Sequence, residues 1–192
     1  MTPAAPRPRA YHWTQRTVHW LVAACVILLV PAGLLIEGYE PKTVEAVNEA
    51  LGQGAFDTIY SLHKSVGLTV LGLMILRVVA RAVHGEPEYV RPPSIKARVS
   101  SGVVHAALYA LLLLTPIVGW IGVSVYPAPA PFWFLFDARL PVSSDRELAN
   151  TLLGDVHGPL GILIGILAAV HILAALKHRL VDRDEVWGRM VP

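Results

Sequence analysis

The sequence predicts an all-α integral membrane protein, folded as a bundle of four transmembrane helices. One observation is composition: 54% of the 192 residues are hydrophobic, only 16% are charged, and the mean hydropathy is +0.53. Ordinary soluble domains are far less apolar. The other is that apolar residues gather in runs of about 20, the length that crosses a bilayer as a helix. The predicted helices span about 17–36, 59–81, 99–126 and 156–176, so that residues 1–192 form a single membrane domain.

The first run could be taken for a secretory signal because it follows a basic segment, MTPAAPRPRAYHWTQR. It is longer than a signal core and ends in IEGYEPK without a small-x-small cleavage site, so we expect it to stay as a helix. Lys64 and Arg77 interrupt the second run, but long basic side chains near helix ends reach the membrane surface. The third and fourth runs are cleaner. FWFLF at 132–136 is too short to span and fits an aromatic anchor at the interface.

The placement of basic residues predicts the orientation. Twelve of the 16 Lys and Arg residues flank the two termini and the link between the second and third runs. They are Arg7, Arg9, Arg16, Arg77, Arg81, Arg91, Lys96, Arg98, Lys177, Arg179, Arg183 and Arg189. By the positive-inside rule we expect both termini and this link in the cytoplasm. The two outer loops carry nine acidic and four basic residues, so we expect a net acidic outer face.

The fourth run carries a histidine near each end, His157 and His171. Fourteen residues of helix separate them, which places the two rings about 21 Å apart along the axis and within about 40° of each other around it. Gly161, Ala168 and Ala175 fall on the same face. A face of small residues is typical of close helix packing, and beside histidines it also suits a flat macrocycle.

Two other runs supply histidines at matching depths. His19 lies near the cytoplasmic start of the first run, level with His171, and His63 lies near the outer start of the second, level with His157. A lone membrane histidine is commonly a hydrogen-bond donor between helices. Two pairs at two depths instead favour bis-histidine ligation of two haems, because facing helices of a bundle can hold a haem iron between axial histidines.

Further polar residues lie at the cytoplasmic level. Arg77 and Arg81 share the helical face of His63 but stand at the other end of the second run. They either mark the topology or pair with haem propionates or a quinone carbonyl. His105 and His178 lie at the same level without a depth-matched partner, and each is either a quinone or propionate contact or an interfacial histidine.

Taken together, several motifs resemble the prokaryotic cytochrome b561 family, four-helix dihaem proteins of the bacterial superoxide oxidase type. The resemblance covers nearly the whole chain. Its motifs are VHW at 18–20, LHKSVG at 62–67, RVVAR at 77–81, HAALY at 105–109 followed by TPIVGW, PFWFLF at 131–136, VHGPLG at 156–161, VHILAALKH at 170–178 and the closing EVWGRMVP.

The resemblance implies that His19 and His171 are axial ligands of an inner haem b, and His63 and His157 of an outer one. It also implies reduction of ubiquinone near the cytoplasmic surface, with Arg77, Arg81 and His178 as candidate contacts. Superoxide on the periplasmic side would give its electron to the outer haem, from which it passes to the inner haem and then to ubiquinone. The protein would then be a multi-pass oxidoreductase of the bacterial inner membrane.

Two alternatives stay open beside this hypothesis. The first is a cytochrome b relay or anchor for a separate dehydrogenase or hydrogenase. The second is a transporter that uses the histidines for metal ions or protons, although the apolar runs hold no Asp or Glu for such a path. The acidic outer loops also suit a basic or neutral donor, whereas Lys64 beside His63 gives local positive charge for an anion. We expect lipid, ubiquinone and a small donor as partners, and no nucleic acid.

Overall fold

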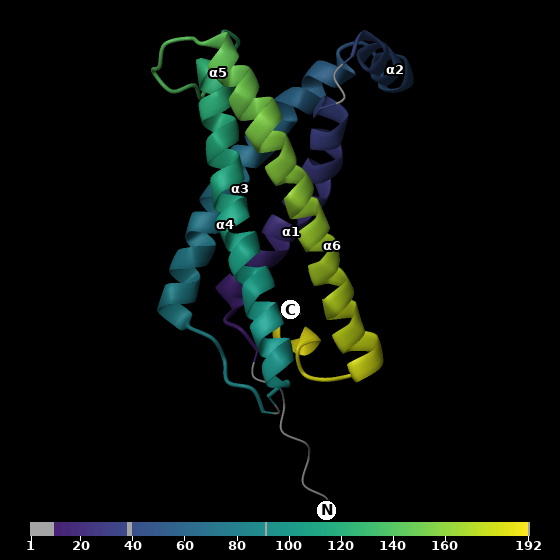
Figure 1. Ribbon diagram of the computed structural model, residues 1–192, viewed down its shortest axis with the longest axis vertical. Helices are drawn as coiled ribbons and strands as arrows, with labels where there is room; N and C mark the ends of the chain where they lie inside the picture. The colour runs from purple at the N-terminus through teal and green to yellow at the C-terminus, as the bar shows by residue number, and fades with distance from the viewer. Residues whose placement is uncertain (1–9, 38–39, 91, 192) are drawn as a thin grey trace, which may run out of the picture.

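The computed structural model describes residues 10–37, 40–90 and 92–191; Arg7, Arg9 and Arg91 of the predicted charge asymmetry lie outside them. Within these ranges the chain forms four long helices. They are α1 (Trp13–Glu37), α3 (Ala55–His84), α4 (Ile95–Val125) and α6 (Gly158–Lys177). Each is long and apolar enough to cross a membrane, α6 together with the helical turns at its ends. The predicted all-α fold is confirmed, and the start of α1 and the C-terminal residues up to Val191 lie at the same end of the bundle, where the Tyr11 N–H bonds to the Arg189 carbonyl (Figure 1).

The first three long helices each begin four residues before their predicted starts. Hydropathy detects only the apolar part of a helix. The first polar turn of each of these helices, outside the hydrocarbon, continues the same backbone hydrogen bonds, so the helix begins earlier than its apolar run. At the start of α4 the Ser94 hydroxyl accepts a hydrogen bond from the Ala97 N–H at 3.3 Å, an N-cap. At the end of α3, Gly85 adopts a positive φ of 65°, which stops the helix.

The fourth helix is longer and less regular than predicted. It begins with α5 (Arg146–Asn150), widens into a π-helical segment η1 (Thr151–His157), continues as α6, and widens again in η2 (His178–Asp182). Pro159 has no N–H to donate to the preceding turn, so the hydrogen-bond ladder there cannot keep its regular pattern. His157, the last residue of η1, lies at this irregular turn.

A short helix and a β-hairpin outside the spanning helices were not predicted. The short helix α2 (Pro41–Leu51) follows α1, with proline in its first turn and no buried residue. Its mixed sequence, PKTVEAVNEAL, gives no hydropathy signal. Between α4 and α5, the strands β1 (Pro131–Phe132) and β2 (Phe136–Asp137) pair antiparallel around a turn in which Trp133 and Phe134 have positive φ. The predicted aromatic anchor therefore forms the tip of a hairpin.

The hairpin is fastened to α3 by hydrogen bonds. The Trp133 N–H donates to the Ser65 hydroxyl at 2.8 Å, and its indole N–H donates to Thr69 Oγ1 at 3.1 Å. The Ser65 hydroxyl, whose residue has no exposed surface, lies 3.1 Å from the Pro131 carbonyl. Lys64 Nζ donates to the Pro129 carbonyl at 3.1 Å. These contacts fix the hairpin against the part of α3 that carries His63.

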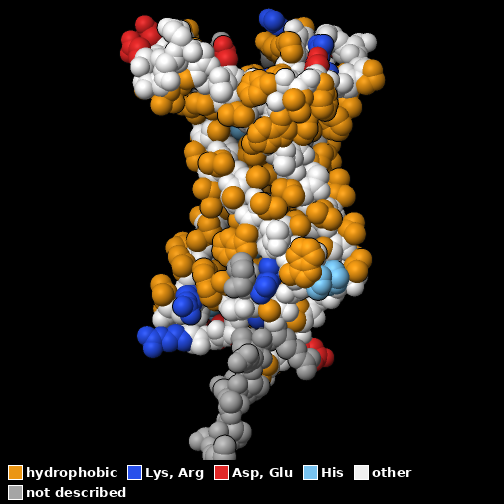
Figure 2. Space-filling view, turned by 180° about the vertical axis from the view of Figure 1, so that it is seen from behind, with side chains coloured by type: hydrophobic (Ala, Val, Ile, Leu, Met, Phe, Trp, Pro, Cys, Tyr) orange, Lys and Arg blue, Asp and Glu red, His pale blue; other side chains and the backbone are white. Residues whose placement is uncertain are grey.

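The core lies at mid-height in the bundle. Val22 and Val26 of α1 pack against Val70 and Met74 of α3 and Ile164 of α6. On α3 these residues fall between His63 and Arg77, and on α6 Ile164 falls between His157 and His171, so apolar packing separates the two levels. Seen from behind, hydrophobic side chains cover the middle of the bundle, and charged side chains gather toward its two ends (Figure 2). This distribution matches a protein surrounded by lipid.

Replacing the buried serine tests the attachment of the hairpin. We expect Ser65→Ala to lower the free energy of unfolding by about 1–3 kcal/mol, because the Trp133 N–H loses its buried acceptor. Thermal unfolding in detergent measures the change. Ser100→Ala is the matched control, since this exposed hydroxyl bonds only to carbonyls of its own helix. Equal midpoints for the two variants would show that the hairpin is not held by Ser65.

Candidate functional site

The structure brings four of the predicted histidines together in two pairs. The rings of His63 on α3 and His157 at the end of η1 have centroids 6.1 Å apart and planes at 79°. Those of His19 on α1 and His171 on α6 are also 6.1 Å apart, at 81°. We call them the outer pair and the inner pair, after the predicted orientation. Their role as ligands stays a prediction.

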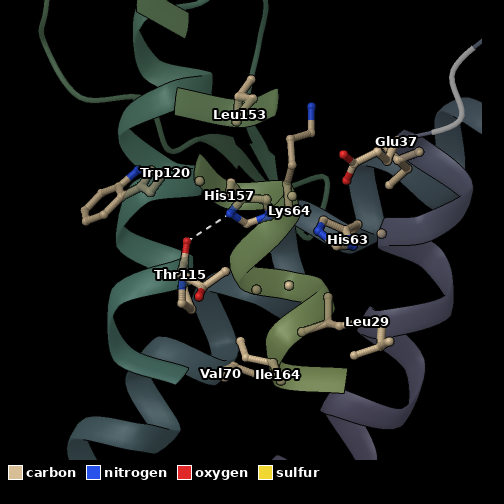
Figure 3. Close-up of a pocket in the computed structure, with 18 of the residues that line it drawn as sticks. Leu29, Glu37, His63, Lys64, Val70, Thr115, Trp120, Leu153, His157 and Ile164 are labelled. Carbon is tan, nitrogen blue, oxygen red and sulfur yellow. Dashed lines mark hydrogen bonds between the residues drawn. The ribbon is translucent and has the colours of Figure 1, made fainter. Parts of the chain in front are cut away.

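The outer pair presents nitrogen atoms that hydrogen bonding leaves available. His157 Nδ1 lies 3.0 Å from the carbonyl oxygen of Thr115, and a carbonyl only accepts, so this nitrogen carries the proton (Figure 3). The lone pair of His157 is therefore on Nε2, the tautomer that metal-binding histidines use when Nδ1 is held in this way. His63 Nδ1 is buried and has no hydrogen-bond partner. A buried nitrogen without a partner is costly unless a ligand satisfies it.

A cavity of about 390 Å³ lies beside the outer pair, lined mainly by apolar side chains. Glycines keep the space next to both imidazoles open. A Cβ on Gly33 would lie 3.2 Å from His63 Cε1, and one on Gly119 only 2.7 Å from His157 Cε1. Gly161, singled out in the sequence for its place on the face of His157, lines the same cavity. An apolar cavity with paired imidazoles and backbone exposed at glycines fits a flat macrocycle held by axial nitrogens.

One cation and one carboxylate belong to the same cavity wall. Figure 3 shows Lys64 and Glu37 on either side of His63, with their charged groups toward the end of the cavity near Leu153. Lys64 Nζ lies 4.4 Å over the ring of Tyr60. The carboxylate of Glu37 packs against Gly158, and a Cβ at that position would displace it. Among the described residues that line the cavity, the charged ones are thus Lys64 and Glu37, near the end of the bundle opposite the start of α1.

The inner pair has a third histidine beside it. The ring centroid of His105 on α4 lies 5.2 Å from that of His171, whereas the His19 centroid lies 6.1 Å from it. The expectation that His105 has no partner at its depth is therefore wrong. The sequence reasoning paired histidines from two helices at each membrane depth. It did not consider that a third helix, α4, brings a histidine to the same depth.

Arg77 is the basic residue that faces the inner pair. Its guanidinium donates to the Gln15 carbonyl at 3.2 Å and lies 5.4 Å from the ring of Tyr109. Among the described residues, no carboxylate forms an ion pair with it. An unpaired guanidinium within an apolar bundle suits an anionic or carbonyl ligand.

The structure does not bring the other two candidates into this group. Arg81 forms an ion pair with Glu86 at the end of the bundle. His178 Nδ1 lies 2.6 Å from Asp184 and 3.4 Å from Asp182, just beyond α6. Both have acidic partners of their own, whereas no ion pair is formed by Arg77 or His105 within the described part of the chain.

Two residues that bear on the outer pair were missed by the sequence reasoning. Thr115 acts through its backbone carbonyl, which no side-chain pattern reveals. Gly119 could have been found, because a glycine inside a long apolar helix often marks a close approach. Both residues lie in TPIVGW, a motif that supported the family resemblance but to which no role at the site was assigned.

Comparison with known proteins covers nearly the whole chain. The sequence profile described as prokaryotic cytochrome b561 matches residues 10–192. "Cytochrome b561 homolog 2" of Escherichia coli (strain K12) is 26% identical over 96% of this chain and 92% of its own length. "Probable superoxide oxidase CybB" of Yersinia pestis is 26% identical, over 96% and 97%. "Cytochrome b562" of Cereibacter sphaeroides is 30% identical over 94% of each chain.

Adding a methyl group at Gly119 by substitution tests whether α4 packs closely against His157. We expect Gly119→Ala to lower the thermal unfolding midpoint in detergent, because the added methyl group overlaps the imidazole and forces it away from the Thr115 carbonyl. The loss should be about 1–3 kcal/mol, the usual cost of overpacking. Gly102→Ala, in the same helix with open space around it, should not destabilise. Equal effects of both substitutions would contradict the packing argument.

Proposed function

The chain belongs to the prokaryotic cytochrome b561 family, whose members bind haem b and transfer electrons in membranes, and from this premise we propose that it holds two haems b and passes electrons from a periplasmic donor to ubiquinone. The observation that carries the proposal is the presence of two histidine pairs, one toward each end of an apolar bundle. Bound haem supplies reversible one-electron chemistry that no side chain of the chain offers.

The outer pair, His63 and His157, would hold one haem. The Thr115 carbonyl that fixes the His157 tautomer supports this assignment, and both histidines line the same apolar cavity. Gly33 and Gly119 leave space against both rings. The protein contributes ligand nitrogens in a fixed orientation, an apolar surround and exclusion of water, all of which influence a haem's potential.

The inner pair, His19 and His171, would hold the second haem. Arg77 would bind a propionate or a quinone carbonyl, since its guanidinium has no acidic partner among the described residues. His105 is a second candidate at this level because it packs against His171. Arg81 and His178 remain candidates nearer the surface, where ubiquinone would arrive from the bilayer.

The orientation proposed is that of a bacterial inner-membrane protein with both termini in the cytoplasm. Described basic residues at the end of the bundle with the chain ends support it through the positive-inside rule. They are Arg16, Arg77, Arg81, Lys96, Arg98, Lys177, Arg179, Arg183 and Arg189. The outer pair then faces the periplasm.

Superoxide is the donor we propose for the outer pair. The Yersinia pestis relative carries that activity in its name, and Lys64 places a cation beside His63. A positive group at a cavity mouth attracts an anion and raises its rate of encounter. The acidic outer loops favour a second candidate, a relay that takes electrons from a basic or neutral redox partner, such as a dehydrogenase or hydrogenase subunit.

Removing one histidine from each pair tests the haem assignment. We expect dithionite-reduced wild-type protein to show a b-type spectrum with two haems per chain. His157→Ala should lose only the outer haem and His171→Ala only the inner one, because each takes away one axial nitrogen. The haem that remains in each variant reports an intact fold. His12→Ala, on an exposed histidine stacked on His84, is the control and should keep both. The ligand assignment fails if either pair variant retains two haems.

Purified protein given superoxide and ubiquinone tests the donor. We expect quinol to form without any partner protein, at a rate that falls as salt screens the charge of Lys64. Lys64→Gln should slow the reaction several-fold and weaken its salt dependence. Lys42→Gln on α2 is the matched control, since this exposed lysine pairs with Glu40. Haem-loaded protein that forms no quinol would favour the relay instead.

A further inference from the structure

The last residues of the chain fold back under the bundle. Beyond η2, residues 185–191, with the short 3-10 helix η3 (Trp187–Arg189), lie against the start of α1 and the link that follows α3 (Figure 1). We call residues 185–191 the C-terminal clamp. It is too short and too polar to span a membrane, and it contains no ligand of the proposed haems. Its contacts nevertheless converge on the helix turn that carries His19.

Three consecutive backbone carbonyls of the clamp accept hydrogen bonds from α1 and the residues before it. The Arg189 carbonyl accepts from the Tyr11 N–H at 2.9 Å. The Met190 carbonyl accepts from the indole N–H of Trp20 at 3.0 Å, and the Val191 carbonyl from the Arg16 guanidinium at 3.0 Å. Since Arg16 and Trp20 stand on either side of His19 in the sequence, the clamp holds the turn that presents this histidine.

The Arg189 side chain anchors the clamp to the link after α3. Only 2% of the residue is exposed, and its guanidinium lies 3.6 Å from the ring centroid of Tyr89 and 5.4 Å from that of Tyr11. It also donates to the Pro87 carbonyl. Burial, and after it the nearby carboxylate of Glu86, raises the pKa of Tyr11, so its ring stays a neutral phenol against the guanidinium. A planar guanidinium stacked over an aromatic ring is a specific use of arginine.

Hydrogen bonds from Gln15 connect the start of α1 to α3 and to Arg77, which faces the inner pair. The Gln15 side chain, almost fully buried, donates to the Gly85 carbonyl at 3.0 Å at the end of α3. Its backbone carbonyl accepts from Arg77, the basic residue that faces the inner histidines. The Glu185 carboxylate accepts from the Val90 N–H at 3.2 Å. The clamp, the link and the first turns of α1 are therefore connected by hydrogen bonds up to the inner site.

We propose that the C-terminal clamp, anchored by Arg189, positions His19 against α3 and α6 and thereby determines how firmly the inner pair holds its haem. The inference rests on the proposed function. Arg189 is a positioning residue, because its contacts are with Tyr11, Tyr89 and Pro87 and not with either inner histidine. The outer pair has its own attachment in the hairpin on Ser65, so loosening the clamp should affect the inner site alone.

The test compares Arg189→Ala with two other variants of the full chain. Haem release to excess apomyoglobin is followed by absorbance, in wild-type protein and in the His157→Ala background, where only the inner pair remains. We expect Arg189→Ala to weaken inner haem binding about 10-fold, the low end of the loss that follows when a group orienting a ligand is removed, because Arg189 acts on His19 through the clamp. Outer haem binding should not change. Arg179→Ala, an exposed arginine at the same end, is the matched control, and Tyr89→Phe, which keeps the aromatic face, should retain most of the affinity.

The outcomes separate the two hypotheses. If wild-type protein binds two haems and Arg189→Ala releases the inner one no faster than Arg179→Ala does, the clamp has no positioning role and the proposed function stands. Equal weakening of both haems would also overturn the inference, because it would show a general loss of fold. Wild-type protein that binds no haem would instead refute the proposed function itself.

Discussion

Imidazole nitrogens buried in an apolar bundle need partners, since each one left unsatisfied there costs free energy. His63 shows the constraint most clearly, because its buried Nδ1 has no hydrogen-bond partner among the described residues. His157 is satisfied on one nitrogen by the Thr115 carbonyl and leaves the other available. The two histidines line one apolar cavity and His157 has a free Nε2, which is why we interpret the pairs as a binding site and not as interhelical hydrogen bonds.

Each level of the bundle is fastened by a different connecting segment. At the outer level the hairpin bonds to α3 through Ser65, two residues after His63. At the inner level the C-terminal clamp bonds to α1 through Arg16 and Trp20, which flank His19. Helices that pack by small and aliphatic side chains can slide or rotate at little cost in lipid, since lipid is as apolar as the contacts. Directional hydrogen bonds beside each ligand resist such motion.

Features that depend on a single helix could be predicted from the sequence, whereas features that depend on how several helices pack could not. Hydropathy located four apolar helices, and the 14-residue spacing of His157 and His171 anticipated their levels. The π-helical turn at His157 and the contact of His105 with His171 depend on how neighbouring helices pack, which no single-helix pattern contains. The C-terminal clamp could not be predicted for a similar reason. In the sequence Arg189 contributes only to the cytoplasmic positive charge, although in the structure it is almost fully buried near the rings of Tyr11 and Tyr89.

The apolar middle of the bundle also restricts what can cross it. Past Lys64, which stands beside His63 at the outer level, the stretches of the four helices between the two histidine levels carry no Asp, Glu, Lys or Arg, and the space is filled by residues such as Val26, Val70 and Met74. Protons need a chain of polar groups or water to move, whereas electrons tunnel through packed hydrocarbon. In the proposed function, therefore, only electrons pass from the outer to the inner level. The protons that ubiquinone takes up must come from the end of the bundle that holds Arg77 and the chain ends, so reduction at that level would consume them from the cytoplasmic side.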